Sequence, residues 1–316
     1  MNLQTATNHG EARANHAAQA SPRAVILAGG EGLRLRALTR ALSGDDRPKQ
    51  FCVLTGGDTL LQQTQRRIAT LIPPERTTIV ITHGHEKYLA PSIAKSGAAI
   101  LTQPCNRGTA PAILYSLLRL ASEATGEEAT TPVALFPADH YFENDAVFVH
   151  HVGRALGAIR QRPHLIILLG IVPHGPEADY GWIVPGNAVS GVLNGSLCLV
   201  RSFHEKPGPG AARELMACGC LWNSFVIVSS AQALRNLMHW ATPDLVGAFS
   251  CAAAAAGGLN EAALDALYAE LEPTDFSRQV LARSPEFLTV LPAANTGWVD
   301  VGRPERALAL PGRAVA

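Results

Sequence analysis

The amino-acid sequence predicts an α/β protein in which helices cover both faces of a mainly parallel β-sheet. Short apolar runs rich in Val, Ile and Leu alternate with longer segments whose apolar residues recur at helical spacing. This alternation is typical of βαβ units, whose right-handed crossovers place helices on both sides of the sheet. The first apolar run also ends in a glycine-rich loop, as expected at the carboxyl edge of such a sheet.

The elements of the first half follow one another in this order. Residues 23–28 predict a buried strand that leads into Gly29-Gly30-Glu31-Gly32. We expect helices over 60–71 and 86–95, and strands over 77–82 and 98–102. A further helix is expected to begin at Thr109, because threonine is a good N-cap and Pro111 suits the first helical turn.

The alternation continues to Pro173 and then changes. We expect strands over 133–136 and 165–172, with a helix over 148–159 between them. Two strands over 181–184 and 197–203 are expected to be joined by a loop with Asn194-Gly195 as its turn signal. The remaining expected elements are strands over 221–228 and 287–291, helices over 231–240 and 261–271, and a helix end or loop over 251–258.

The chain contains no internal repeat and no clean linker, so its 316 residues are expected to form one domain over 23–316. Residues 1–22 are polar and rich in alanine, and they lack the basic start and apolar stretch of a secretory signal. We therefore expect residues 1–22 to be a loose N-terminal tail.

The composition excludes several classes of protein. The charge is balanced, with 26 basic and 26 acidic residues and no basic block, which argues against a nucleic-acid partner. The longest clean apolar run, 165–169, is far shorter than the roughly 20 residues of a membrane helix. Six cysteines in a chain of this length do not indicate a disulfide framework. These features lead us to expect a cytoplasmic protein.

The glycine loop is the first candidate site. Glycines let backbone N–H groups approach phosphate oxygens closely, and the cations Arg34 and Lys49 follow the loop. The loop is not a Walker motif, and Leu35 takes the place of the third glycine of a dinucleotide fingerprint. Glycines followed by spaced cations suit a triphosphate, and the alternative is a tight turn with solvated arginines.

Seven groups of residues, in register along the chain, resemble the motifs of sugar-1-phosphate nucleotidyltransferases. They are 27–35 with 47–51, 103–112, 136–140, 170–173 with 180–182, 203–207, 221–224 and 297–302. Gln50-Phe51 resembles the mannose-1-phosphate guanylyltransferases (GDP-mannose pyrophosphorylases) in particular. The resemblance implies a Rossmann-like fold of the nucleotide-diphospho-sugar transferase type, in a divergent short form without a C-terminal β-helix or isomerase domain.

The resemblance also implies roles for individual residues. Nucleotide binding is expected at Leu27, Ala28, Gly29, Gly30, Gln103, Gly108 and Thr109, and catalytic cations at Arg34, Lys49 and Lys206. Gly181, Glu205 and Asn223 are expected to contact the sugar, and Asp139 and Asp300 to bind Mg²⁺, which prefers oxygen ligands. Lys49 and Lys206 are two of only four lysines. The structural alternatives are a turn or helix cap for each aspartate and an exposed ion pair for Glu205–Lys206.

Three positions depart from the pattern of these enzymes. Ala37 stands where the opening motif has proline, which changes the stiffness of the loop more than its chemistry. Gly108 stands where guanylyltransferases have asparagine, a difference that bears on recognition of the base or ribose. Phe225 stands where the motif Trp-Asn-Ser-Gly has its glycine, and a phenylalanine near the sugar site could narrow it.

The expected activity is transfer of a nucleotidyl group from a nucleoside triphosphate to a sugar 1-phosphate, with Mg²⁺ as cofactor. GTP and mannose 1-phosphate, giving GDP-mannose, are the favoured pair. Other pairs remain open, namely UTP or dTTP with glucose 1-phosphate and GTP with a heptose phosphate. A non-catalytic regulatory protein that binds a sugar nucleotide is a second class, and a dinucleotide-dependent oxidoreductase is a distant third. A homodimer remains a candidate assembly.

Overall fold

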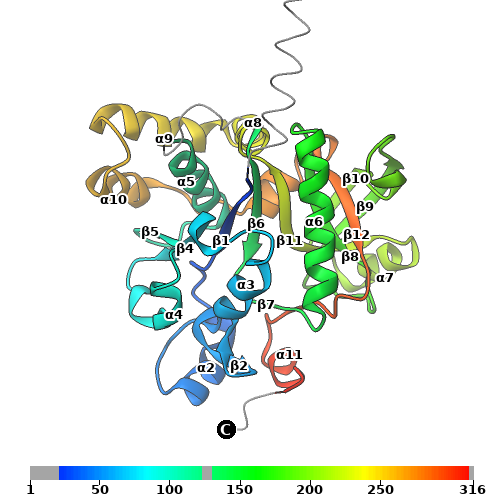
Figure 1. The fold of residues 1–316 in the computed structure, drawn as a ribbon, viewed down its shortest axis with the longest axis horizontal. Coiled ribbons are helices and arrows are strands. Elements are labelled where there is room, and N and C mark those ends of the chain that lie inside the picture. The colour runs from blue at the N-terminus through cyan, green and yellow to red at the C-terminus, as the bar shows by residue number, and fades with distance from the viewer. Residues whose placement is uncertain (1–20, 123–129, 313–316) are drawn as a thin grey trace, which may run out of the picture.

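A central nine-stranded sheet organises the chain in the computed structural model, which describes residues 21–122 and 130–312 (Figure 1). In spatial order its strands are β5 (Ala99–Gln103), β4 (Thr77–Thr82), β1 (Arg23–Leu27), β6 (Pro132–Pro137), β11 (Leu221–Ser230), β8 (Ile166–Ile171), β12 (Thr289–Ala293), β10 (Cys198–Glu205) and β9 (Gly181–Ala188). Two small sheets pair β2 (Val53–Thr55) with β3 (Asp58–Thr59), and β7 (His140–Tyr141) with β13 (Val299–Asp300).

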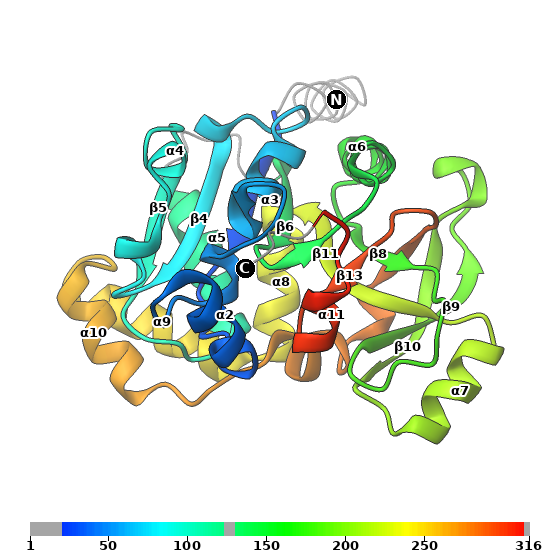
Figure 2. The same cartoon turned by 90° about the horizontal axis from the view of Figure 1, so that it is seen from below.

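Helices cover both faces of the central sheet, as predicted. They are α2 (Arg36–Ser43), α3 (Leu60–Ile68), α4 (Pro91–Ala94), α5 (Thr109–Ser122), α6 (Asp145–Gln161), α7 (Pro209–Ala217), α8 (Ala231–Ala241), α9 (Pro243–Ala256), α10 (Glu261–Glu270) and α11 (Pro304–Leu308). Viewed from below, α3 and α6 lie on one side of the sheet, and α8, α9 and α10 lie on the other (Figure 2).

The strands divide the interior into two cores, because successive side chains of a strand point to opposite faces. In β1, Ile26 packs into the core beneath α3 and α6, whereas Val25 packs into the core beneath α5 and α8. In β8, Leu169 packs into the first of these cores and Leu168 packs into the second. Burial on both faces explains why these strands appear in the sequence as continuous apolar runs.

The sheet is parallel in one half and mixed in the other. Strands β5, β4, β1 and β6 run parallel, whereas β11 runs antiparallel to both β6 and β8. Strands β9 and β10 form the expected antiparallel pair, because strands joined by a short connection must reverse direction. The α/β prediction is therefore confirmed, and its mainly parallel character belongs to the half in which strands and helices alternate.

Several elements differ from the expectation. Residues 86–95 do not form one helix, because Pro91 holds Ala90 in an extended conformation and separates a short 3₁₀ turn from α4. The alanine-rich stretch 251–258 ends the long helix α9, which Gly257 terminates in a left-handed conformation. No helix was predicted for the residues of α2 or α7.

Two further observations concern the predictions from composition. All six cysteines are free thiols. No helix in the part of the chain that the structure describes is long and apolar enough to cross a bilayer. Residues 1–20 of the predicted tail lie outside the described residues, whereas the carbonyl oxygens of Ser21 and Pro22 accept hydrogen bonds from Arg76.

Candidate functional site

The carboxyl edge of the parallel strands collects loops from both halves of the chain. Strands β1 and β6 end there side by side, and the antiparallel strand β11 begins there. Glu205 at the end of β10 pairs with Gly181 at the start of β9, and Trp182 pairs with Trp222 of β11. The sequence-distant motifs meet at this edge, where ligands bind in open α/β sheets.

The glycine loop after β1 is held from behind by buried side chains. Gln50 donates from Nε2 to the carbonyl oxygens of Ala28 and Gly30, at 2.8 Å in each case. Thr82 donates from its hydroxyl to the carbonyl oxygen of Gly29 at 2.9 Å. These bonds occupy three carbonyl groups of the loop and fix its path, which favours presentation of the backbone N–H groups to a ligand.

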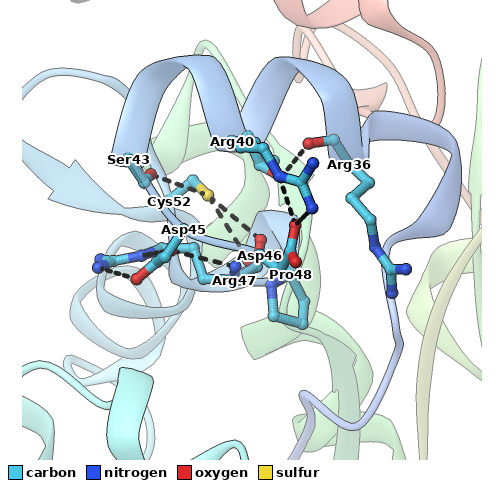
Figure 3. Close-up of polar contacts among 9 residues, drawn as sticks. Arg36, Arg40, Ser43, Asp45, Asp46, Arg47, Pro48 and Cys52 are labelled. Atoms are coloured by element: carbon cyan, nitrogen blue, oxygen red, sulfur yellow. Dashed lines mark hydrogen bonds and ion pairs between the residues drawn. The ribbon is translucent and has the colours of Figure 1, made fainter.

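The cations that follow the loop have different environments (Figure 3). Arg40 pairs with Asp46, and Arg47 donates from Nε and Nη2 to the two carboxylate oxygens of Asp45, at 2.8 Å each. These pairs hold the turn between α2 and Pro48, while the guanidinium of Arg36 points away from both aspartates. The charge of Arg47 is therefore neutralised by a neighbour in the sequence, whereas Lys49 pairs with carboxylates that are distant in the sequence.

Lys49 connects the two aspartates expected to bind metal. Its ammonium lies 3.0 Å from Asp139 Oδ2 and 3.5 Å from Asp300 Oδ1, and it donates to the carbonyl oxygen of Val301 at 2.6 Å. Burial alone would lower the pKa of Lys49, but the two carboxylates outweigh it and raise the pKa. Lys49 in turn lowers the pKa of Asp139 against the opposing effect of burial. The three groups therefore form one charged cluster.

A two-stranded sheet brings the aspartates together. Asp300 in β13 pairs with His140 in β7, and Asp139 directly precedes β7. His140 accepts a hydrogen bond at Nδ1 from the indole N–H of Trp298, at 3.1 Å. The ring proton of a neutral His140 then lies on Nε2, which faces Asp139 Oδ1 and Asp300 Oδ1 at 3.8 Å.

The residues expected to contact the sugar also lie together. A Cβ atom added to Gly181 would lie 2.8 Å from Glu205 Oε2 and 3.2 Å from Asn223 Cβ, so only glycine leaves room for both side chains. Lys206 Nζ lies 3.5 Å from Glu205 Oε1. Burial raises the pKa of Glu205, and the nearby ammonium of Lys206 opposes this effect only in part.

Lys206 has a left-handed backbone, with φ +50°, and it is held by a neighbouring loop. Its N–H donates to the carbonyl oxygen of Tyr180 at 3.2 Å. The Tyr180 ring packs edge-on against Trp222 and Trp298, and the guanidinium of Arg306 lies 4.4 Å above it. Arg306 also donates to Glu177 Oε2 at 2.6 Å. Helix α11 therefore supports the loop that orients Lys206.

Two cavities meet at the charged cluster. The first, of about 240 Å³, is lined by residues that include Leu27, Gly30, Thr109, Gly181, Glu205, Lys206, Asn223 and Phe225. The second, of about 390 Å³, is lined by the glycine loop from Glu31 to Leu35, including Arg34, and by Lys49 and Gly302. Both are lined by Asp139, His140 and Asp300. The aspartates therefore stand between a space that also holds Arg34 and Lys49 and a space that holds Glu205, Lys206 and Asn223.

The donor set fits a magnesium ion that is also held by a ligand. Asp139 and Asp300 supply hard carboxylate oxygens and lie within reach of one cation, as their contacts with Lys49 show. Within residues 21–122 and 130–312 there is no cluster of three His, Cys, Asp or Glu side chains suited to a metal. The remaining ligands would therefore be phosphate oxygens and water, as is usual for Mg²⁺.

Comparison with known proteins shows the family of the chain. The model of the family described as Nucleotidyl transferase matches residues 23–310, and so includes the glycine loop, both aspartates and the sugar-side residues. The chain belongs to the nucleotidyl transferase family.

Individual nucleotidyl transferase relatives add detail. The alginate biosynthesis protein AlgA of Pseudomonas aeruginosa is 29% identical over 286 residues, which are 88% of this chain and 56% of AlgA. Mannose-1-phosphate guanylyltransferase 2 of Escherichia coli O157:H7 is 31% identical over 70% of this chain and 46% of its own length. The chain spans about half the length of these curated relatives. A solved mannose-1-phosphate geranyltransferase from Thermus thermophilus superposes with a TM-score of 0.76 at 28% identity, covering 92% of this chain and 80% of that structure.

Two of the residues predicted to bind nucleotide lie beside the segment 272–277, here called the strap. Gly108 has φ +89°, and a Cβ atom there would lie 2.4 Å from the carbonyl oxygen of Thr274, so the backbone passes where a side chain would stand. Thr109 lines the first cavity and accepts a hydrogen bond at its hydroxyl from the N–H of Phe276, at 2.9 Å.

Two other predicted residues lie behind the cavity lining. Gln103 is 2% exposed, and its Nε2 donates to Thr82 Oγ1 at 3.0 Å. That nitrogen lies 2.5 Å from the position of a Cβ atom at Gly29, so Gln103 packs directly beneath the glycine loop. Ala28 is also buried. The structure therefore places Gln103 beneath the loop and Ala28 at its buried start.

The structure also reveals supporting residues that the sequence prediction missed. Thr82 and Arg306 are the main examples, because neither stood in a segment singled out as a motif. Thr82 ends the buried strand β4, where a polar residue after an apolar run is a usable signal. Arg306 lies in a short surface helix, and its sequence surroundings carry no such signal.

Proposed function

We propose that this chain transfers a nucleotidyl group from a nucleoside triphosphate to a sugar 1-phosphate and releases pyrophosphate. The observation that carries the proposal is the position of Asp139 and Asp300 between the two cavities, with Lys49 paired to both. Two carboxylates that can hold a divalent cation, with an ammonium beside them, suit a reaction whose transition state concentrates negative charge on phosphate oxygens. Named mannose-1-phosphate guanylyltransferases among the relatives support GTP and mannose 1-phosphate as the pair, with GDP-mannose as product.

In this proposal an oxygen of the sugar 1-phosphate attacks the α-phosphorus of the triphosphate. A new P–O bond forms, the bond from the α-phosphorus to the bridging β-oxygen breaks, and pyrophosphate leaves with that electron pair. No side-chain base is required, because the attacking phosphate is already anionic near neutral pH. The chain therefore contributes orientation and charge neutralisation.

The residues divide this work between them. The glycine loop with Gly29, Gly30 and Arg34 would hold the β- and γ-phosphates, and Lys49 would neutralise charge between the cavities. Asp139 and Asp300 would hold Mg²⁺, which when bound supplies positive charge to the reacting phosphates. Leu27 and Thr109 line the first cavity beside the expected base site, while Ala28, Gln103 and Gly108 shape the adjoining loops.

The sugar phosphate would bind on the other side of the aspartates. Glu205 can accept hydrogen bonds from two sugar hydroxyls, and the ammonium of Lys206 can pair with the phosphate. Asn223 lines the same cavity, and the absence of a side chain at Gly181 leaves room for Glu205. The cytoplasmic location and the homodimer expected from the sequence belong to this proposal.

The test is pyrophosphate release with Mg²⁺ across four nucleoside triphosphates and several sugar 1-phosphates. We expect the largest kcat/KM with GTP and mannose 1-phosphate. A larger kcat/KM with another pair would contradict the assignment of GTP and mannose 1-phosphate, but it would still support nucleotidyl transfer as the reaction. If no pair released pyrophosphate while GTP or GDP-mannose bound, the chain would be a binding protein and the proposed reaction would be wrong.

A further inference from the structure

Strand β11 contains a wide irregularity at the edge of the first cavity. Asn223 pairs with Gly170 of β8, and Ile227 pairs with Leu168, so four steps along β11 face two steps along β8. The extra residues form a bulge, and Phe225 at its centre has φ +59°. A bulky residue with a left-handed backbone is a true outlier, and such strain is concentrated at functional sites.

The bulge is held in place by its own polar side chains. Asn223 Oδ1 accepts a hydrogen bond from the N–H of Phe225 at 3.1 Å. Ser224, which is fully buried, donates to the carbonyl oxygen of Leu169 at 2.6 Å and accepts from the N–H of Val226 at 3.2 Å. The N–H groups of Phe225 and Val226 are therefore both satisfied within the bulge, which defines the conformation of Phe225.

The ring of Phe225 packs against the core beside the cavity. Its centroid lies 6.2 Å from that of Phe276, in an edge-on arrangement, and Phe276 is completely buried. The strap that carries Phe276 is tied to the base-side segment, because Thr274 accepts from the N–H of Ala110 at 3.0 Å. Because the ring of Phe276 is buried and its strap is hydrogen-bonded in place, the ring of Phe225 has little room to move when a ligand enters the cavity.

We propose that Phe225 is a specificity-determining residue that restricts the sugar site to hexose 1-phosphates without a bulky acylamino substituent. This inference rests on the proposed nucleotidyl transfer. Phe225 lines the same cavity as Glu205, Lys206 and Asn223, and that cavity measures only about 240 Å³. In a space of this size, an aromatic ring excludes added volume and gives the sugar an apolar face to pack against.

The test compares mannose 1-phosphate with N-acetylglucosamine 1-phosphate in the wild-type protein and in Phe225→Gly. Glycine removes the ring and adopts the left-handed conformation without strain. We expect the ratio of kcat/KM for the two sugars to move at least about tenfold toward the N-acetylated sugar, a typical effect of pocket volume on discrimination. Phe225→Asn is the second variant, because asparagine also tolerates this backbone conformation.

Leu193→Gly is the matched control. Leu193 also has a left-handed backbone, with φ +48°, and it lies outside the residues that line either cavity. Its replacement removes strain elsewhere and should leave the ratio unchanged. A ratio that stays within twofold in folded Phe225→Gly and Phe225→Asn, or that moves equally in Leu193→Gly, would overturn the proposal.

Binding of both sugar phosphates by calorimetry separates this inference from the proposed reaction. If no pair releases pyrophosphate, the proposed reaction is wrong. The ratio of the dissociation constants of the two sugar phosphates still tests the role of Phe225. An unchanged ratio of dissociation constants in an otherwise active enzyme would overturn the role of Phe225 alone. A wild-type protein that uses or binds the two sugars equally would also overturn it.

Discussion

Lys49 and Asp139 form the central ion pair of the candidate site, with Lys49 Nζ 3.0 Å from Asp139 Oδ2. The same ammonium donates to the carbonyl oxygen of Val301, and so joins the segment after the glycine loop to β6 and to the C-terminal segment. The pair therefore has a structural role in addition to its proposed catalytic one. Predictions for the site have to separate these two roles.

Asp139→Asn tests the catalytic role of the cluster. We expect turnover to fall by at least about 100-fold, as when a charge-stabilising group is removed from an active site. The fold should persist, because Lys49 keeps its contacts with Asp300 and Val301. Pyrophosphate release and circular dichroism measure the two effects. Asp265→Asn on the exposed side of α10 is the control, and near wild-type activity of Asp139→Asn would remove Asp139 from the site.

Lys206→Ala and Lys206→Gly together separate charge from backbone strain. Both variants lack the ammonium, so both should lose measurable turnover while remaining folded. Lys206 has φ +50°, a conformation that costs an alanine roughly 1–2 kcal/mol and a glycine very little. Thermal denaturation should therefore rank Lys206→Gly as the more stable variant. Turnover close to wild type in either protein would contradict the assignment of Lys206.

Glu205→Gln tests the effect of burying a charged group. Because burial raises the pKa of Glu205 above its ordinary value of 4.5, the folded state binds this proton more tightly than the unfolded state. Wild-type stability therefore gains a contribution as pH falls from neutral toward about 4.5. Glu205→Gln should have a higher Tm than wild type at pH 7, and the gap should narrow toward that pH. A constant gap, or a lower Tm at pH 7, would be the contrary result.

Arg306→Ala tests the support that α11 gives to the sugar side. Loss of its hydrogen bonds and of its contact with Tyr180 should lower the free energy of unfolding by about 1.5–3 kcal/mol. It should also raise KM for the sugar phosphate more than it lowers kcat, because Lys206 is held by Tyr180. Arg306→Lys should rescue only in part, since lysine lacks the planar fork.

Arg303→Ala is the control for Arg306. Arg306 also donates to Asp179 Oδ2 at 3.3 Å. Arg303 pairs with the same carboxylate but is more than half exposed, so its ion pair should contribute little. Equal effects of the two alanine variants on KM would show that KM for the sugar phosphate depends on neutralisation of Asp179 and not on the contact of Arg306 with Tyr180.

Local patterns predicted much of the fold and the glycine loop, whereas the roles of the other candidate site residues were implied by the family resemblance. The buried strands, the glycine loop and the polar residues that follow strands all have signatures within a few residues. The prediction of one helix over 86–95 was wrong, because Pro91 interrupts it. For α9, the sequence analysis predicted only a helix end or loop over 251–258. Thr82 and Arg306 were missed because their roles depend on neighbours remote in the sequence.

The sequence by itself determined which residue types stand at the ends of which strands, because apolar periodicity and glycine act locally. The tertiary structure decided which of those residues meet. Antiparallel insertion of β11 brings Asn223 and Phe225 to the cavity, and pairing of β13 with β7 places Asp300 near Asp139. The tertiary structure also decided that Lys49 reaches the aspartates, whereas the pair of Arg47 with Asp45 is local. Such outcomes depend on burial and charge summed over distant segments, which no local pattern contains.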